Sequence, residues 1–209
     1  MEQLLITLPV LVFSIVLHEV AHGWVARREG DPTAAMLGRI TLNPIPHIDP
    51  IGSILVPALL LLTSSGFIFG WAKPVPVNIG RLRRQRRDYV LVAAAGPASN
   101  LLLALGASVG LSLLTVSPMT LDEPNVSAPI AALLGQALRL NVLLAVFNML
   151  PIPPLDGGNV LGGLLPHAIE ARYDALIRPY GFLLLYALMF TRGFDYLVIA
   201  PARFLLSWL

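Results

Sequence analysis

The chain lacks cysteine entirely and carries little charge. Without cysteine among its 209 residues, disulfides and thiolate metal sites are excluded. Only 12% of the residues are charged, whereas 56% are hydrophobic. A soluble domain of this length has too little interior to bury so much apolar surface. We therefore expect a membrane protein embedded in a lipid bilayer.

Other features are also missing from the sequence. No basic patch interleaved with aromatic residues is present, so we expect no nucleic-acid partner. The longest polar connections, 27–50 and 157–177, are too short for an independent domain. We expect one domain over 1–209, with a core at about 4–158 and a C-terminal helical region at about 166–209. The first apolar run has no small-residue cleavage site, so we expect it to be retained in the protein.

Apolar runs dominate what remains. A bilayer-crossing helix needs about 20 residues, and five regions reach that length: 4–26, 51–71, 89–116, 128–150 and 178–209. The last is interrupted at 191–195, so one short span followed by an interfacial helix is an alternative for it. The five regions predict an all-α polytopic membrane protein with about four to five transmembrane helices and one re-entrant segment. We expect it in the cell (cytoplasmic) membrane as a multi-pass protein. No internal repeat is visible, which disfavours a transporter built from inverted repeats.

The re-entrant segment is predicted from the positions of the basic residues, because cytoplasmic loops are enriched in them. They follow the first run (Arg27, Arg28, Arg39) and precede the third (Lys73, Arg81, Arg83, Arg84, Arg86, Arg87). A single crossing cannot join two loops on one side, so 51–71 is expected to enter the membrane and return. Pro57 and Gly66 are candidate breaking points. The alternative is that 51–71 spans and one loop is assigned to the wrong side.

A metal-binding motif lies inside the first apolar run. His18-Glu19-Val20-Ala21-His22 has the form HExxH. Residues four apart share one helix face, so both imidazoles can ligate one metal ion. Glu19 lies about 100° further around the helix, near enough to accept a proton from activated water. Ionisable groups are costly in hydrocarbon. A zinc site that cuts peptide bonds within the bilayer would explain why His18, Glu19 and His22 occur together in an apolar run.

A third ligand is needed, because a catalytic zinc has three protein ligands. Asp156 follows the fourth apolar run in Pro-Ile-Pro-Pro-Leu-Asp-Gly-Gly, where prolines end a helix and glycines allow close backbone approach. The predicted topology places His22 and Asp156 at the same end of their spans. An ordinary polar turn is the alternative for Asp156. His47 and Asp49, in a proline-rich loop, are expected to be satisfied loop residues, with a second polar site as the alternative.

Asn148, just before that segment, has two interpretations. It is a neutral donor suited to a developing oxyanion, or a helix-end amide that caps carbonyls ahead of Pro151. A helical substrate must unwind before attack, and 67–77 is predicted to offer it a small extended, β-like edge. Ile68, Phe69 and Gly70 are the candidate substrate-binding residues on that edge.

Three ordered motifs resemble the site-2 protease family of intramembrane zinc metalloproteases. They are HExxH at 18–22, Ala-Gly-Pro-Ala-Ser-Asn at 95–100, similar to the signature at the start of the family's middle core helix, and the Asn-to-Asp-Gly segment at 148–157. The resemblance covers most of 13–158. It implies that His18, His22 and Asp156 bind one Zn²⁺, that Glu19 is the general base, and that Asn148 orients substrate or stabilises the oxyanion.

By this resemblance the substrates are transmembrane segments of membrane-anchored proteins, cut in regulated intramembrane proteolysis. The chain lacks the PDZ and nucleotide-sensing modules of some relatives, so it resembles a minimal subgroup. A metal-ion transporter or channel that uses the same His/Asp site is the main alternative, and an iron(II) centre or an inactive binding protein are others. A glutamate beside the ligands favours zinc-dependent hydrolysis.

Overall fold

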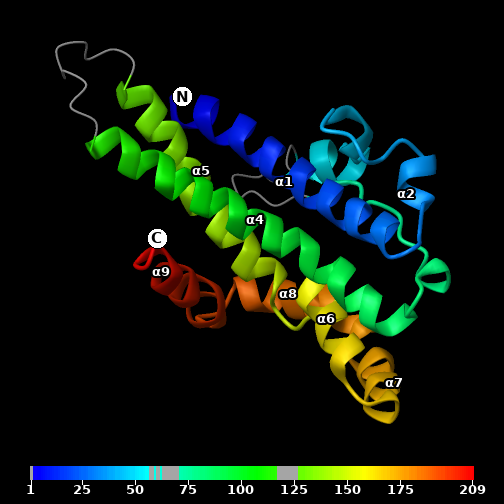
Figure 1. Ribbon diagram of the computed structural model, residues 1–209. Helices are drawn as coiled ribbons and strands as arrows, with labels where there is room; N and C mark the ends of the chain where they lie inside the picture. Colours follow the sequence, from blue (N-terminus) through cyan, green and yellow to red (C-terminus); the bar gives the residue numbers. More distant parts are fainter. Residues whose placement is uncertain (1, 57–58, 60–61, 63–70, 117–126) are drawn as a thin grey trace.

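The computed structural model describes residues 2–56, 59, 62, 71–116 and 127–209. Within these ranges the chain is helical and contains no strand. Three long helices form its body (Figure 1): α1 (Glu2–Arg28), α4 (Gln85–Val116) and α5 (Ser127–Asn148). The shorter helices are α2 (Thr33–Met36), α6 (Asp156–Leu164), α7 (His167–Leu176), α8 (Gly181–Met189) and α9 (Ala200–Leu206). Single helical turns occur at Ile45–His47, Pro50–Leu55, Ile79–Arg81, Arg178–Tyr180 and Asp195–Ile199.

The three long helices are apolar enough to cross a membrane. Their apolar stretches are Ile6–Arg28, Gln85–Leu114 and Ala128–Asn148, of 23, 30 and 21 residues, and about 20 residues suffice. The predicted count of four to five spans is not confirmed. The last apolar region forms α8 and α9, of 9 and 7 residues, and a helix rises only about 1.5 Å per residue. Each is too short to span alone.

Helix α4 is the centre of the bundle. It packs against α1, α5 and α6, and α1 also contacts α5. Small and β-branched side chains allow close packing where Ala104 of α4 and Val142 of α5 meet Ala202 of α9. The C-terminal region therefore covers one side of the α4–α5 pair, and α6 crosses the end of α4 that lies near the end of α1 (Figure 1).

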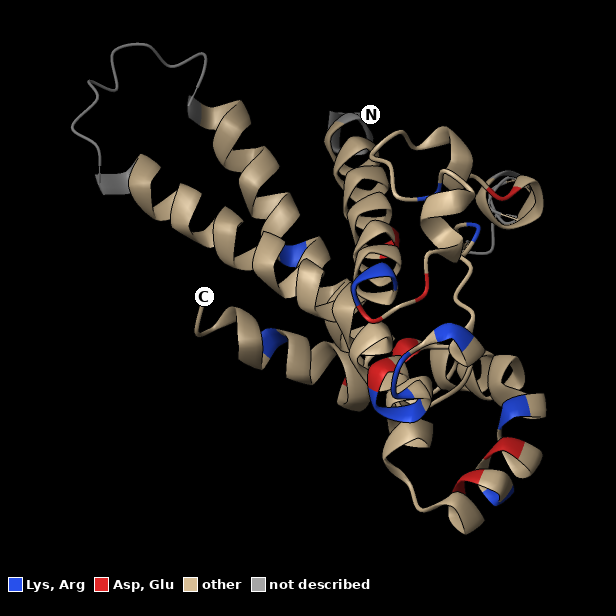
Figure 2. Cartoon of the chain, turned by 45° about the vertical axis from the view of Figure 1, so that its right-hand side comes forward, with Lys and Arg blue, Asp and Glu red and all other residues tan. Residues whose placement is uncertain are grey.

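The two basic loops lie at the same end of the bundle. The Arg83 amide donates to the Glu29 carbonyl at 3.0 Å, and the Arg39 guanidinium donates to the Lys73 carbonyl at 2.8 Å. Figure 2 shows most charged residues gathered at this end of the molecule. The premise of the re-entrant prediction, that both loops share one side, therefore agrees with the packing.

The ends of the 51–71 region also meet. The Trp71 amide donates to the Gly52 carbonyl at 3.1 Å, and the Ser53 hydroxyl donates to the Trp71 carbonyl at 2.8 Å. A segment that returns to its starting point is what a re-entrant element requires. Its depth in a bilayer stays a prediction.

The predicted β-like edge is not confirmed. Residues 71–78 form an irregular segment, and its Lys73 and Val75 amides are already bonded to the His47 carbonyl and the Glu19 carboxylate. These two donors face the protein, because helix α1 and the preceding loop supply the acceptors. The three candidate substrate-binding residues, Ile68, Phe69 and Gly70, lie outside the described residues.

Candidate metal centre

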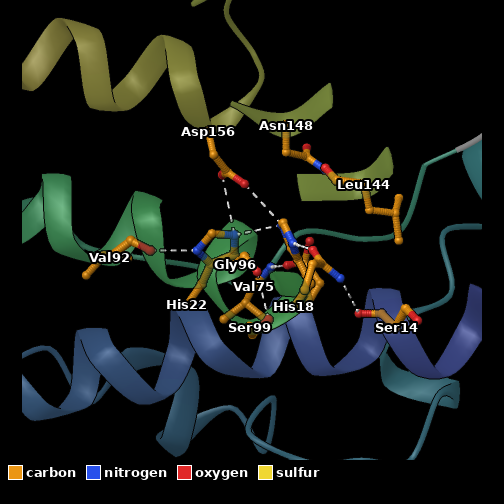
Figure 3. A network of polar contacts seen from close by, with 12 residues as sticks. Ser14, His18, His22, Val75, Val92, Gly96, Ser99, Leu144, Asn148 and Asp156 are labelled. Carbon is orange, nitrogen blue, oxygen red and sulfur yellow. Dashed lines mark hydrogen bonds and ion pairs between the residues drawn. The ribbon is translucent and has the colours of Figure 1, made fainter. Parts of the chain in front are cut away.

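Three ligand-type side chains converge between α1 and α6. His18 and His22 lie one turn apart on α1, with their Nε2 atoms 3.0 Å from each other. Asp156 lies across from them, with Oδ2 3.1 Å from His18 Nε2 and Oδ1 3.4 Å from His22 Nε2 (Figure 3). One donor atom from each residue falls within 4.8 Å of the others. The structure thus brings together all three metal ligands expected from the sequence.

The turn before α6 positions Asp156 beside the two histidines. Asp156 is the first residue of α6, after Leu155 in extended conformation. A Cβ on Gly157 would lie 2.2 Å from the Met149 carbonyl oxygen, and one on Gly158 would lie 2.5 Å from the Pro153 nitrogen. Only glycine fits where the chain folds back this tightly against the end of α5. The close backbone approach expected from this Gly-Gly pair is therefore present.

Each histidine is hydrogen-bonded through Nδ1 to an oxygen atom on α4. His22 Nδ1 lies 2.7 Å from the Val92 carbonyl oxygen, and His18 Nδ1 lies 2.6 Å from Asn100 Oδ1, both on α4. A carbonyl only accepts, so His22 carries its proton on Nδ1 and, in the neutral form, turns the lone pair of Nε2 toward Asp156. Such partners orient a metal-ligating imidazole.

The chemistry of this pocket fits a cation. The two histidines are 7% and 9% exposed, and Asp156 Oδ2 is buried with no hydrogen-bond partner in the described part of the chain, beyond its approach to His18. Buried acceptors that face one another repel unless a positive charge lies between them. A Cβ on Gly96 would lie 2.5 Å from Nε2 of each histidine, so this glycine leaves the space open. Two imidazoles and one carboxylate form a zinc-type donor set.

The two proposed catalytic residues are placed differently. Glu19 follows His18 on α1, and its Oε2 accepts a 2.7 Å hydrogen bond from the Val75 amide. Asn148 ends α5, and its side-chain nitrogen donates to the Leu144 carbonyl at 2.9 Å (Figure 3). This contact matches the helix-end interpretation of Asn148 in the present conformation, and it occupies one of the two amide hydrogens.

Two polar residues of the loop after α1 differ in how well they are satisfied. Asp49 accepts from the Ile51 and Gly52 amides, as expected of a satisfied loop residue. His47 is buried with Nε2 3.0 Å from the Thr41 carbonyl, but its Nδ1 is buried with no hydrogen-bond partner among the described residues, so the expectation is met only in part. Neither belongs to the metal-type cluster found among the described residues. Their second-site alternative gains no support from this geometry.

Sequence reasoning missed several residues around the metal centre. Gly96 and Asn100 lie in the Ala-Gly-Pro-Ala-Ser-Asn motif, which was assigned no role, and Asn141 lies on α5. The motif lies well inside α4 and not at its start. An asparagine within an apolar run is itself a signal of function, because polar groups are costly in a bilayer.

A buried centre of two imidazoles and one carboxylate, carried by apolar helices, is the arrangement of a membrane metalloprotease. The profile of Peptidase family M50 matches residues 6–188, and the chain belongs to this family. It is 40% identical to YwhC of Bacillus subtilis over 91% of this chain and 81% of that protein. YwhC is provisionally named a zinc metalloprotease.

Similarity extends to actinobacterial proteins. Rip2 of Mycolicibacterium smegmatis, also provisionally named a zinc metalloprotease, is 34% identical over 86% of this chain and 64% of that protein. Rip2 of Mycobacterium tuberculosis is 32% identical over 84% of this chain and 62% of that protein. The chain thus spans less than two thirds of either Rip2. No solved structure shows significant similarity to it. The protein is a membrane metalloprotease with zinc as its metal, as the sequence predicted.

Proposed function

We propose that this protein is an intramembrane zinc endopeptidase that cuts transmembrane segments of membrane-anchored proteins. In this proposal His18, His22 and Asp156 hold one zinc ion, Glu19 is the general base, and Asn148 contacts the reacting carbonyl. The observation that carries it is the convergence of three ligand atoms within 4.8 Å, directly beside Glu19, on helices suited to a bilayer.

Depth in the bundle supports an intramembrane reaction. His18 and His22 lie within the apolar stretch Ile6–Arg28 of α1, toward the end at which the basic loops meet. Asn100, which contacts His18, lies within the apolar stretch Gln85–Leu114 of α4. A peptide bond that reaches these residues must come from a chain lying in or beside the membrane.

Glu19 is the chain's own proton carrier in this scheme. When bound, zinc supplies Lewis acidity that acidifies a water molecule and polarises the scissile carbonyl. The Glu19 carboxylate accepts a proton from water and returns it to the departing amine. The Val75 amide donates to Oε2, and in this proposal Oε1 is the atom that exchanges the proton.

Asn148 and the 51–71 region would handle the substrate. The second amide hydrogen of Asn148 can stabilise negative charge on the attacked carbonyl, at no cost in net charge. Ile68, Phe69 and Gly70 remain our candidates for pairing with an unwound substrate. A proline at position 68 or 69 would remove a backbone donor, and it should slow cleavage without changing zinc content.

We further propose a multi-pass position in the cytoplasmic membrane, with 51–71 re-entrant, and a role in regulated intramembrane proteolysis. The shared end of the basic loops supports this orientation, because such loops stay cytoplasmic. Cleavage near that end would release the cytoplasmic part of a substrate.

Purified protein in proteoliposomes tests the proposal against the transporter alternative. Zinc-dependent cleavage of a labelled single-span substrate, lost in Glu19→Gln and unaccompanied by zinc flux into the vesicles, is the expected result. Flux without cleavage would establish the alternative. Trapping substrates with Glu19→Gln, followed by mass spectrometry, would then identify the physiological partners.

A further inference from the structure

Behind His18, a buried column of polar side chains crosses the interface of α1, α4 and α5. Asn100 Nδ2 donates to Asn141 Oδ1 at 2.9 Å, and Asn141 Nδ2 donates to the Ser14 hydroxyl at 2.9 Å. Ser14, Asn100 and Asn141 are 1%, 0% and 1% exposed. None of them belongs to the metal-type cluster, yet the column ends 2.6 Å from Nδ1 of His18, which does.

The donor and acceptor of every hydrogen bond in this column are fixed at the end away from His18, by the Ala137 carbonyl. Asn141 Nδ2 also lies 2.9 Å from the Ala137 carbonyl oxygen. A backbone carbonyl cannot donate, so the side chain of Asn141 must turn its nitrogen to Ala137 and its oxygen to Asn100. That oxygen requires a donor, which turns the Asn100 nitrogen toward Asn141.

The oxygen of Asn100 is consequently the atom that faces His18. The Ser14 carbonyl, 3.5 Å from Asn100 Nδ2, favours the same orientation. An amide oxygen accepts only, so His18 Nδ1 must carry the proton and Nε2 must carry the lone pair. The reverse orientation of either asparagine would set oxygen against oxygen inside an apolar bundle.

We propose that Asn141 and Asn100 are positioning residues for the zinc ligand His18. Together they impose the tautomer in which Nε2 is free to bind metal, and the fixed reference is the Ala137 carbonyl on α5. This inference rests on the proposed role of His18 as a ligand. The inference goes beyond that role, because it assigns a function to two side chains outside the proposed ligand set.

Helix association is the competing explanation, since asparagines join helices in membranes. The chain offers a matched control. Gln136, also on α5, donates to the Thr7 hydroxyl of α1 at 3.1 Å. Gln136→Leu removes a polar link between α1 and α5 without touching the column, whereas Asn141→Leu and Asn100→Leu remove the column itself.

The test is cobalt(II) binding to the full-length protein in detergent, followed by visible absorption and chelator competition. We expect metal affinity to fall about 10- to 100-fold in Asn100→Leu, the usual effect of losing a ligand's hydrogen-bond partner. Asn141→Leu should shift affinity in the same direction, with an altered cobalt spectrum. Asn141→Asp, whose protonated carboxyl keeps an acceptor for Asn100 and a donor for the Ala137 carbonyl, should restore much of the loss, and Gln136→Leu should bind cobalt normally.

A second measurement needs no variant. In cadmium-loaded protein with isotope-labelled histidine, coupling to the cadmium nucleus should identify Nε2 of His18 as the ligand and Nδ1 as protonated. Binding through Nδ1, or wild-type cobalt affinity and spectrum in Asn141→Leu, would overturn the inference. His18→Ala separates a failure of the positioning role from a failure of the proposed function. If this variant binds metal normally, the proposed ligand set itself is wrong.

Discussion

Glu19 Oε2 accepts a hydrogen bond of 2.7 Å from the backbone amide of Val75, a residue 56 positions away along the chain. The expected general base on α1 is therefore held by the irregular segment 71–78, which the Asp31 carboxylate and the Arg39 guanidinium also bind. The hydrogen bond from Val75 fixes the position of one carboxylate oxygen of Glu19. The segment after the 51–71 region and the metal centre are thus physically connected.

Replacing this base should separate chemistry from metal binding. Glu19→Gln leaves the three proposed ligands intact, so zinc content should stay near one per chain. Cleavage should fall by about 10²- to 10⁴-fold, because proton transfer from water is lost. Zinc analysis beside a gel-based cleavage assay measures both. Substantial residual cleavage would remove Glu19 from its assigned role.

Removing the proposed carboxylate ligand should have a different effect. Asp156→Ala leaves two imidazoles, which are too few for a catalytic zinc site. Zinc content after dialysis and proteolysis should therefore fall together. Asp174→Ala is the control, since Asp174 is exposed and pairs with Arg178 on the surface. Wild-type zinc content in Asp156→Ala would mean that another residue is the third ligand.

Gly96→Ala should block the metal site by bulk alone. The added Cβ would lie 2.5 Å from Nε2 of both His18 and His22, in the space open to the metal. Alanine favours helix over glycine by about 1 kcal/mol, so reduced helix stability would not explain a loss of zinc.

The matched control is Gly106→Ala on the same helix, where a Cβ would meet no atom within 4 Å. We expect zinc content to fall steeply in Gly96→Ala alone, measured beside thermal unfolding. Equal zinc content in the two variants would contradict the placement of Gly96 against the histidines.

Asp31 should make stability depend on pH in acid. Burial acts to raise its pKa, but hydrogen bonds from Thr33 and the Asn78 amide outweigh this and hold the pKa below its ordinary value. Its stabilisation is therefore complete above about pH 3.9 and is lost as the pH falls through the lowered value.

Asp31→Asn should destabilise the protein by about 1–3 kcal/mol at neutral pH and flatten the acid limb of the unfolding curve. Thermal unfolding in detergent at stepped pH measures this. Asp174→Asn, on the exposed face of α7, should change neither feature. An unchanged acid limb in Asp31→Asn would show that other groups govern it.

Single cysteines can test the topology, because the chain has none of its own. Glu29→Cys directly follows α1 and Gln85→Cys begins α4, each beside one of the two basic loops, whose backbones are joined by the 3.0 Å bond from Arg83 to Glu29. A membrane-impermeant thiol reagent should label both only after the cells are opened. Labelling of Gln85→Cys from outside, with Glu29→Cys protected, would make 51–71 a true span.

Much of the metal centre was predictable because its signals are local. The spacing of His18 and His22 follows from helix periodicity, and Asp156 was indicated by the proline and glycine residues around it. The number of spans was not predictable in this way. The polar residues Thr191-Arg192-Gly193-Phe194-Asp195 interrupt 178–209 and indicate a break between α8 and α9, but they do not tell whether either helix crosses a bilayer.

The sequence by itself determined that this is a membrane protein with a zinc-type motif and a candidate carboxylate partner, because hydropathy and short spacings depend only on neighbours along the chain. Tertiary structure alone decided which atoms contact Nδ1 of each histidine. Asn100 and Asn141 are 82 and 123 residues beyond His18, and no local pattern relates them to it. Their hydrogen-bond directions follow from three packed helices, since a buried amide must match each donor to an acceptor that another helix supplies.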